Sequence, residues 1–181
     1  ICERIRENGE PGFAWLENMR TFGRMADPKN TRDVKAMGGN PCLEQTLESF
    51  EMCCLVETFP DKHESLEDFL ETLRFAFMYA KTVTLGGTQW EQTNEILFRN
   101  RRIGCSMSGL AEFVTSRGLG TLHQWCEEGY RAISTIDQEI SGEAKDWKIF
   151  SGAESPPPPS FQRRHIKPSG TVSLLAGATP G

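Results

Sequence analysis

Long hydrophobic runs and an excess of positive charge are both missing from this sequence. No apolar stretch approaches the roughly 18 residues that a membrane-spanning helix needs, so we expect no membrane partner. Lysine and arginine number 20 against 25 aspartates and glutamates, and the net charge of −5 argues against a broad nucleic-acid-binding surface. A local pocket for a small anionic ligand is still compatible with this balance. Apolar residues make up 38% of the 181 residues, which fits a folded, globular chain.

Cysteine is too sparse for a disulfide-stabilised scaffold. The sequence has no C-x-x-C motif, and none of its three histidines stands at zinc-ligand spacing from a cysteine, so we expect no metal site. Residues 1–10 are charged and lack the apolar core of a signal peptide. These features favour a reducing, cytoplasmic location. Because the chain starts at Ile1 and stops within a Gly/Thr/Pro sequence, we expect an interior fragment of a longer protein. The six cysteines are Cys2, Cys42, Cys53, Cys54, Cys105 and Cys126.

Apolar periodicity predicts helices that alternate with strands, which favours an α/β architecture with parallel strands. The clearest helix covers residues 65–81, where Ser65 followed by Asp68 is typical of a capped start. The other predicted helices are 1–9 with a cap at Gly9, 11–18, 91–100, an irregular turn from Arg101 into a helix that ends at Gly118, and 121–141. The predicted strands are Met52–Val56, Val83–Leu85 and a strand-like part of 165–181, whereas 20–39 and 142–164 show no regular pattern.

Asn40, Cys42 and Glu44 are the first candidates for chemistry. As alternate residues of an extended segment they would project to one side, bringing together an amide, a thiol and a carboxylate. Such a set can bind a ligand, react through sulfur and act as a general base. On spacing alone, an ordinary turn with a buried cysteine and a solvated glutamate explains the same residues better.

Three further motifs each have a plainer alternative. Cys53 and Cys54 fit two core thiols of one strand better than a redox pair. The segment Lys167–Thr171 offers a glycine and two hydroxyls to a phosphate, or it is a surface turn, and it lacks the Walker pattern. The segment Arg101–Gly104 fits helix capping and ion pairing better than a phosphate grip.

Four segments, taken together and in order, resemble one protein family. They are ENGEPGFAWLENMRTFGRM, MGGNPCLEQTLESFEMCCLVETFP, NRRIGCSMSGLAEF and IKPSGTVSLLAGATPG. This set resembles the adenosylcobalamin-dependent (class II) ribonucleotide reductases, and the monomeric ribonucleoside-triphosphate reductase type in particular. The similarity covers residues 1–141 and 165–181.

The resemblance implies a fold class and a role for the first motif. The fold is α/β, a ten-stranded barrel built from two antiparallel halves of parallel strands, of which this chain would form part. A finger loop, residues 38–48 here, would thread the barrel. Cys42 would carry a transient thiyl radical at the tip of this loop. Asn40 and Glu44 would hydrogen-bond the substrate ribose and take the proton of its 3′-hydroxyl group.

The resemblance also implies roles for two later motifs. Cys53 would be one of two cysteines that supply electrons and become a disulfide, with its partner upstream of this chain. Cys54 has no implied redox role. Ser169, Gly170 and Thr171 would receive the substrate phosphates.

The implied activity is reduction of ribonucleoside triphosphates to 2′-deoxyribonucleoside triphosphates for DNA synthesis. Adenosylcobalamin would be the cofactor that generates the radical. Thioredoxin or a similar dithiol would be the reductant, and a nucleotide effector would act through regions outside this chain. A thiol suits hydrogen exchange with the substrate because its S–H bond is comparable in strength to the C–H bond.

Residues 142–164 depart from the family pattern, because they are proline-rich where a helix end and a strand are expected. They fit an insertion or an imperfectly predicted gene segment. Two alternatives therefore stay open. One is a non-catalytic remnant that at most binds nucleotide, and the other is a related thiyl-radical reductase with another radical source.

Overall fold

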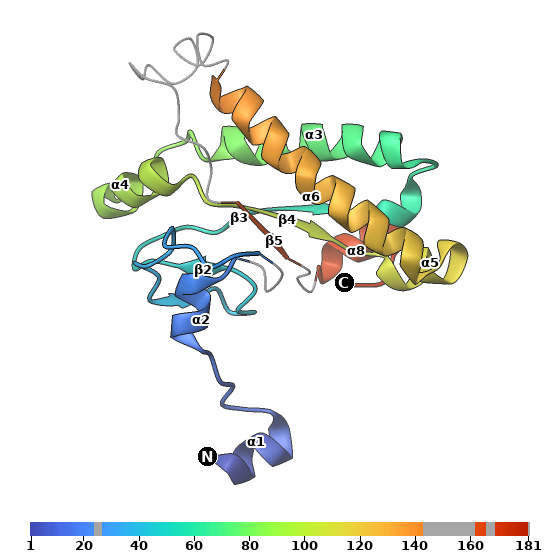
Figure 1. Ribbon diagram of the computed structural model, residues 1–181. Coiled ribbons are helices and arrows are strands. Elements are labelled where there is room, and N and C mark those ends of the chain that lie inside the picture. The colour runs from blue at the N-terminus through green and yellow to red at the C-terminus, as the bar shows by residue number, and fades with distance from the viewer. Residues whose placement is uncertain (24–26, 143–161, 166–168, 181) are drawn as a thin grey trace. The chain divides into compact units, whose positions relative to one another are not determined.

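The computed structural model describes residues 1–23, 27–142, 162–165 and 169–180. These residues divide into two compact units, Ile1–Ser49 and Phe50–Gly181. Figure 1 shows the elements of both units and labels most of them.

The first unit contains two short helices and a hairpin of two very short strands. Helix α1 (Cys2–Asn8) ends at Gly9, whose left-handed conformation (φ 76°) confirms the predicted cap. Helix α2 (Leu16–Thr21) begins later than the predicted 11–18, since Gly12 disfavours a helix at the start of that segment. Strands β1 (Gly38–Gly39) and β2 (Thr46–Leu47) pair antiparallel, with Gly38 opposite Leu47 and Gly39 opposite Thr46.

The second unit is organised around a parallel sheet with the strand order β3-β4-β5. This arrangement confirms the predicted α/β architecture with parallel strands. The strands are β3 (Cys54–Thr58), β4 (Ile103–Met107) and β5 (Gln162–His165). The register sets Cys54 opposite Ile103 and Thr58 opposite Met107, and it sets Ile103 opposite Gln162 and Ser106 opposite His165.

Helices connect and cover these strands. The backbone N–H of Asp68 donates to the Ser65 hydroxyl at 3.2 Å, which confirms the predicted start of the first long helix. The predictions of helices over 91–100 and 121–141 and of a helix that ends at Gly118 are also confirmed. The helices of this unit are α3 (Leu66–Val83), α4 (Glu91–Asn100), α5 (Leu110–Arg117), α6 (Leu119–Gly142), α8 (Thr171–Ala176) and the 3-10 turn η1 (Pro60–Lys62).

The core of the second unit lies where α3 and α6 pack over the sheet (Figure 1). The rings of Phe69 and Trp125 stack with their centroids 5.4 Å apart, and Phe113 meets Trp125 edge-on at 4.8 Å. The other buried core side chains include Leu73, Phe77, Ile103, Ile133, Ile136 and Ile140.

Two predictions about the middle of the chain are wrong. The segment after Arg101, expected to be an irregular turn, contains the central strand β4. It shows no apolar alternation because both of its faces are buried, and Gly104 and Ser106 have low strand propensity. Val83–Leu85, expected to be a strand, ends α3 and enters a turn in which the N–H of Thr84 donates to Ala80 O.

Predictions near the C-terminal end and at β3 are also corrected. The strand expected within 165–181 lies earlier, at β5, inside the segment that seemed unpatterned, and Thr171–Ala176 forms helix α8. Gly170 and Gly177, both with positive φ, delimit this helix. Residues 143–161, which hold the four consecutive prolines, lie outside the described residues. The strand expected over Met52–Val56 begins at Cys54 instead.

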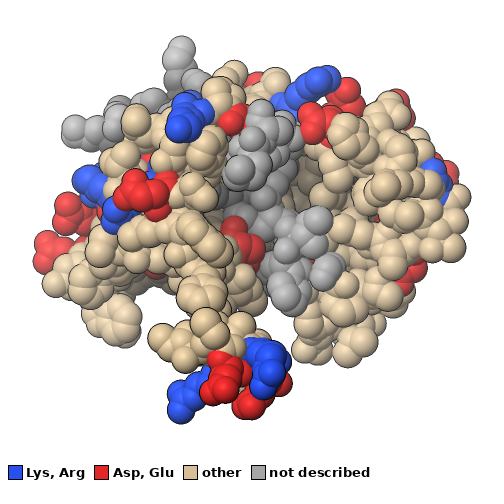
Figure 2. Space-filling view, turned by 60° about the horizontal axis from the view of Figure 1, so that its bottom comes forward, with Lys and Arg blue, Asp and Glu red and all other residues tan. Residues whose placement is uncertain are grey.

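None of the described helices is long and apolar enough to cross a membrane. Figure 2 shows acidic and basic side chains interspersed on the visible face, with no continuous basic patch among the described residues drawn there.

A buried ion pair joins α3 to α6. The ammonium group of Lys81 donates to Asp137 Oδ1 at 2.7 Å and to the Ser141 hydroxyl at 2.8 Å. The side chains of Lys81 and Asp137 are 0% and 3% exposed. Burial lowers the pKa of Lys81, and nearby Arg101 lowers this pKa further, whereas Asp137 raises it.

We predict that Asp137→Asn lowers the free energy of opening of α3 and α6 by about 3–5 kcal/mol, since it leaves a buried ammonium group without its counter-ion. Hydrogen exchange of both helices measures this change. Glu139→Gln is the control, because it removes the exposed Arg74–Glu139 pair from the same helix. It should cost less than about 1 kcal/mol. Equal effects of the two substitutions would contradict the assignment.

Candidate active site

A tight turn between β1 and β2 brings Asn40 and Glu44 into contact. The side chain of Asn40 makes two hydrogen bonds. Its Nδ2 donates to Glu44 Oε1, and its Oδ1 accepts from the backbone N–H of Gln45 at 3.1 Å. The backbone N–H of Asn40 donates to Gln45 O at 3.0 Å, and Leu43 N–H donates to Asn40 O at 2.9 Å. Asn40 therefore holds both ends of the turn.

The geometry corrects the expected extended segment. Leu43 has a left-handed conformation (φ 58°), so Asn40, Cys42 and Glu44 do not alternate along a strand. Asn40 meets Glu44 because the chain folds back on itself. The plainer interpretation is therefore right about the turn, but Cys42 is exposed rather than buried, and Glu44 Oε2 is buried rather than solvated.

Several polar atoms at this turn are buried without a hydrogen-bond partner among the described residues. They are Glu44 Oε2 and both polar atoms of the Gln45 side chain, and Gln45 is 0% exposed. Such atoms normally pair with another group, so this turn has hydrogen-bonding capacity for a ligand. Sequence reasoning missed Gln45, because nothing in its spacing distinguishes it from a solvated glutamine.

Hydrogen bonds connect the loop before β1 to the β1–β2 hairpin and to α2. The Thr46 hydroxyl on β2 donates to Asp33 Oδ2, and both residues are buried. The guanidinium Nε of Arg20 donates to Ala36 O at 2.8 Å, which connects α2 to the same loop. Met37 N–H donates to Leu47 O at 2.9 Å and closes the hairpin at its open end.

The two neighbouring cysteines of the second unit differ in environment. Cys53 precedes β3 and is partly exposed, whereas Cys54 is its first residue and is buried. Burial raises the pKa of the Cys54 thiol, which disfavours the thiolate that redox chemistry needs. Cys54 is therefore a core thiol, as predicted.

The Ser169–Thr171 motif forms a closed turn before α8. The Ser173 hydroxyl donates to Gly170 O at 2.7 Å, and Gly170 has a backbone conformation (φ 56°, ψ −126°) that favours glycine. Ser169 is 5% exposed, and its Oγ has no hydrogen-bond partner among the described residues. A buried hydroxyl normally pairs with another polar group, so its partner lies outside the described residues.

The segment that follows α8 is anchored to the carboxyl end of the sheet. Gly109 N–H, just after β4, donates to Thr179 O at 3.0 Å. Glu112 accepts from the Thr179 N–H at 2.9 Å and from its hydroxyl at 2.7 Å, and hydrogen bonds from Thr179 lower the pKa of Glu112. The Ser169 turn therefore lies at the carboxyl ends of the parallel strands, whereas Cys53 lies at their amino ends.

Glu51, two residues before Cys53 in the chain, is the centre of a buried polar cluster. Its Oε1 accepts from Arg102 Nε at 2.7 Å and from Asn100 Nδ2 at 2.8 Å. The Arg102 and Glu51 side chains are 0% and 1% exposed. Arg101 ends α4 in a left-handed conformation (φ 46°) and donates to Thr84 O. The predicted capping and ion-pair role of this arginine pair is confirmed.

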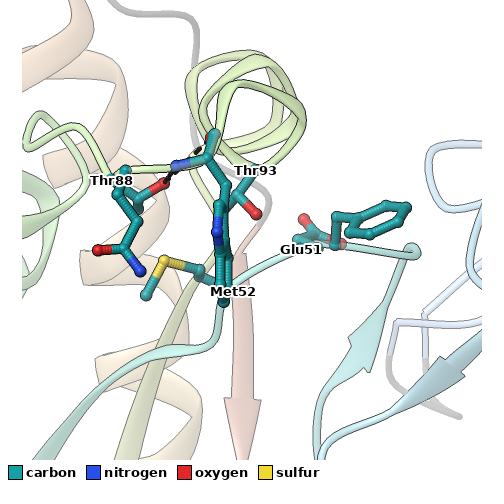
Figure 3. Close-up of a pocket in the computed structure, with 7 residues that line it drawn as sticks. Glu51, Met52, Thr88 and Thr93 are labelled. Atoms are coloured by element: carbon teal, nitrogen blue, oxygen red, sulfur yellow. Dashed lines mark hydrogen bonds between the residues drawn. The ribbon is translucent and has the colours of Figure 1, made fainter.

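A cavity of about 450 Å³ opens beside this cluster. Figure 3 shows Met52 and Thr88 on one side of it and Glu51 and Thr93 on the other. Thr93, on α4, is only 4% exposed. The full lining comprises Phe50, Glu51, Met52, Thr88, Gln89, Trp90 and Thr93.

Comparison with known proteins gives a consistent result. The chain is 57% identical over 182 residues to a probable adenosylcobalamin-dependent ribonucleoside-triphosphate reductase of Dictyostelium discoideum, and 57% identical over 180 residues to such a reductase of Euglena gracilis. These alignments cover 100% and 99% of this chain but 23% of each relative. The Lactobacillus leichmannii reductase is 34% identical over 201 residues, which is 27% of its length. No family model matches the chain.

A crystal structure of a B12-dependent (class II) ribonucleotide reductase matches the fold with a TM-score of 0.80 and 32% sequence identity. The match covers 100% of this chain and 28% of that protein, so the chain spans about a quarter of the relatives it matches. Over its whole length, the chain is a homologue of one segment of the adenosylcobalamin-dependent ribonucleoside-triphosphate reductases.

Proposed function

We propose that the protein containing this chain reduces ribonucleoside triphosphates to 2′-deoxyribonucleoside triphosphates with adenosylcobalamin as cofactor. The observation that carries this proposal is the Asn40–Glu44 turn, which holds a carboxylate and an amide together beside an exposed thiol. The 57% identity over the whole chain supports it. We infer that β3, β4 and β5 form part of one half of a ten-stranded barrel, with residues 38–48 as its finger loop.

The residues of the turn fit a radical cofactor. When bound, adenosylcobalamin supplies the radical that removes a hydrogen atom from a thiol. The exposed thiol of Cys42 is open to that reaction. Cys42, as a thiyl radical, would take the 3′-hydrogen atom of the ribose. At the end of the reaction it would return a hydrogen atom to the same carbon.

Glu44 has the arrangement that a general base needs. Asn40 holds one carboxylate oxygen, and the other oxygen has no partner among the described residues. That second oxygen would accept the 3′-hydroxyl proton while the 2′-hydroxyl group leaves as water. Two electrons would then come from the thiols of Cys53 and an upstream cysteine, which become a disulfide. Thioredoxin or a similar dithiol would restore them in a reducing cytoplasm.

The turn before α8 would bind the substrate phosphates. The buried hydroxyl of Ser169 has no partner among the described residues. Gly170 has no side chain, so a phosphate could approach its backbone closely. Thr171 adds a second, exposed hydroxyl. The effector nucleotide would act through other parts of the protein.

We predict that Glu44→Gln, in the full-length protein, slows deoxynucleotide formation by at least ~100-fold and leaves nucleotide binding nearly unchanged. The amide keeps the shape and can still accept from Asn40, but it cannot take the proton. Single-turnover assays and equilibrium dialysis measure the two effects. Glu71→Gln, at an exposed carboxylate on α3, should match the unaltered protein. Lost binding with normal turnover of bound substrate would make Glu44 a binding residue instead.

We predict that Cys42→Ser and Cys53→Ser fail at different steps. An O–H bond is much stronger than an S–H bond, so Cys42→Ser should give no sulfur radical in freeze-quench EPR. Cys53→Ser should give the radical but little deoxynucleotide. Cys2→Ser, at an exposed cysteine on α1, should have no effect. Identical kinetics in the first two variants, or normal product from folded Cys42→Ser, would refute these roles.

We predict that Ser169→Ala raises the KM for the triphosphate about tenfold, because a hydrogen bond to a charged group contributes about 1.5–3 kcal/mol. Protein stability should change little, since the Ser169 hydroxyl has no partner to lose among the described residues. Steady-state kinetics and thermal unfolding test both parts. Ser116→Ala on α5 is the control. An unchanged KM for Ser169→Ala would remove this residue from the phosphate site.

A further inference from the structure

Helix α8, which follows the proposed phosphate-binding turn, has little apolar packing. Among its six residues, Ser173 is the buried one, whereas Leu174 and Leu175 are 75% and 87% exposed. The hydrophobic core that the described residues form includes no residue of α8. Because few apolar contacts fix α8, the position of the turn before it depends on polar contacts.

A series of hydrogen bonds connects that turn to Thr179, beyond the end of α8. The Ser173 hydroxyl donates to Gly170 O, within the turn, at 2.7 Å. The backbone carbonyl group of Ser173 accepts from the Ala178 N–H at 3.0 Å. Thr179 is the next residue, so a shift of Thr179 would move Ser173 and, through its hydroxyl, the backbone of Gly170.

Glu112, on α5, binds Thr179 with both oxygens of its carboxylate. Oε1 accepts from the Thr179 N–H at 2.9 Å, and Oε2 accepts from the Thr179 hydroxyl at 2.7 Å. Figure 1 shows α8 and α5 next to each other at one end of the sheet. Hydrogen bonds from Thr179 lower the pKa of Glu112, so the carboxylate is charged at neutral pH and both contacts are charge-assisted.

The residue before α5 supports the same contact. Gly109 N–H donates to Thr179 O at 3.0 Å. A Cβ atom at Gly109 would collide with Asp61 Oδ1 and would lie 3.3 Å from Ala178 Cβ, and the φ of Gly109 is 76°. Glycine is therefore required for this close approach. The segment after α8 is thus held by a backbone contact at Gly109 and by the side chain of Glu112.

We propose that Glu112 is a positioning residue for the phosphate-binding turn. By fixing Thr179 it fixes α8 and, through Ser173, the backbone of Gly170. This inference rests on the proposed role of the Ser169–Thr171 turn in binding the substrate phosphates. Since a carboxylate repels a phosphate, we assign Glu112 to positioning and not to contact with the phosphates. A loosened turn should weaken phosphate binding but leave the reaction of bound substrate unchanged.

The test compares Glu112→Ala with Glu112→Gln in the full-length protein. Alanine removes both hydrogen bonds, whereas glutamine can accept from the Thr179 N–H and donate to the Thr179 hydroxyl oxygen. Glu112→Ala should raise the KM for the triphosphate about fivefold with nearly unchanged kcat, and Glu112→Gln should stay within about twofold of the unaltered protein. Glu139→Ala is the control. It removes another partly exposed carboxylate that bonds a second helix, at 2.6 Å from Arg74, and should change neither constant.

Two further measurements separate positioning from a general loss of structure. The phosphate-free ribonucleoside, used as a competitive inhibitor, should keep its inhibition constant in Glu112→Ala, because it does not use the turn. Hydrogen exchange of the Ala178 amide should be faster in Glu112→Ala than in Glu139→Ala. If Glu112→Ala does not fold, Thr179→Val, which loses the hydroxyl contact alone, should raise the KM about twofold.

Three results would overturn the proposal. They are an unchanged KM in the folded variant, equal increases in Glu112→Ala and Glu112→Gln, and an equal loss of inhibition by the nucleoside. An unchanged KM in Ser169→Ala would instead refute the phosphate role of the turn. Faster exchange at Ala178 in Glu112→Ala would still show that Glu112 fixes α8.

Discussion

Burial of β4 on both faces is the constraint on which the second unit depends. The strand lies between β3 and β5, and residues Ile103–Ser106 are all buried. One face of this strand is covered by apolar side chains of α3 and α6, which lie on the same side of the sheet (Figure 1). The burial of β4 also places Arg102, the residue immediately before this strand, in the interior. A buried guanidinium needs a counter-charge, and the carboxylate of Glu51 lies 2.7 Å from Arg102 Nε.

The two candidate motifs of the second unit lie at opposite ends of its parallel strands. Cys53 lies at the amino end of β3, two residues after Glu51, whose buried carboxylate pairs with Arg102. The carboxyl edge, where ligands bind in many open α/β sheets, holds the Ser169 turn. The Ser173 hydroxyl donates to Gly170 O in this turn, and Thr179, after α8, is bonded to Gly109 and Glu112. The turn that contains Cys42 belongs to the first unit and is organised by one residue, Asn40, through side-chain and backbone hydrogen bonds.

Amphipathic helices were the most predictable part of the fold, because one face of each is apolar at helical spacing, as in residues 65–81 and 121–141. Strand β4 was missed since a strand buried on both faces, with glycine and serine in it, has no alternation to detect. Contact between Asn40 and Glu44 was expected, but through an extended segment rather than a turn. The roles of Cys42, Cys53 and Ser169 came from family resemblance, because spacing alone favoured plainer interpretations. Gln45 had no sequence signal at all.

The central claim is that this chain carries the cysteine that becomes a radical. It is tested most directly by freeze-quench EPR of the full-length protein mixed with adenosylcobalamin, a ribonucleoside triphosphate and a dithiol. The account predicts a nucleotide-dependent paramagnetic signal whose hyperfine structure narrows when cysteine is labelled with deuterium at its β-carbon, and which precedes deoxynucleotide formation. A signal that ignores this labelling, or deoxynucleotide formed with no such signal, would contradict it.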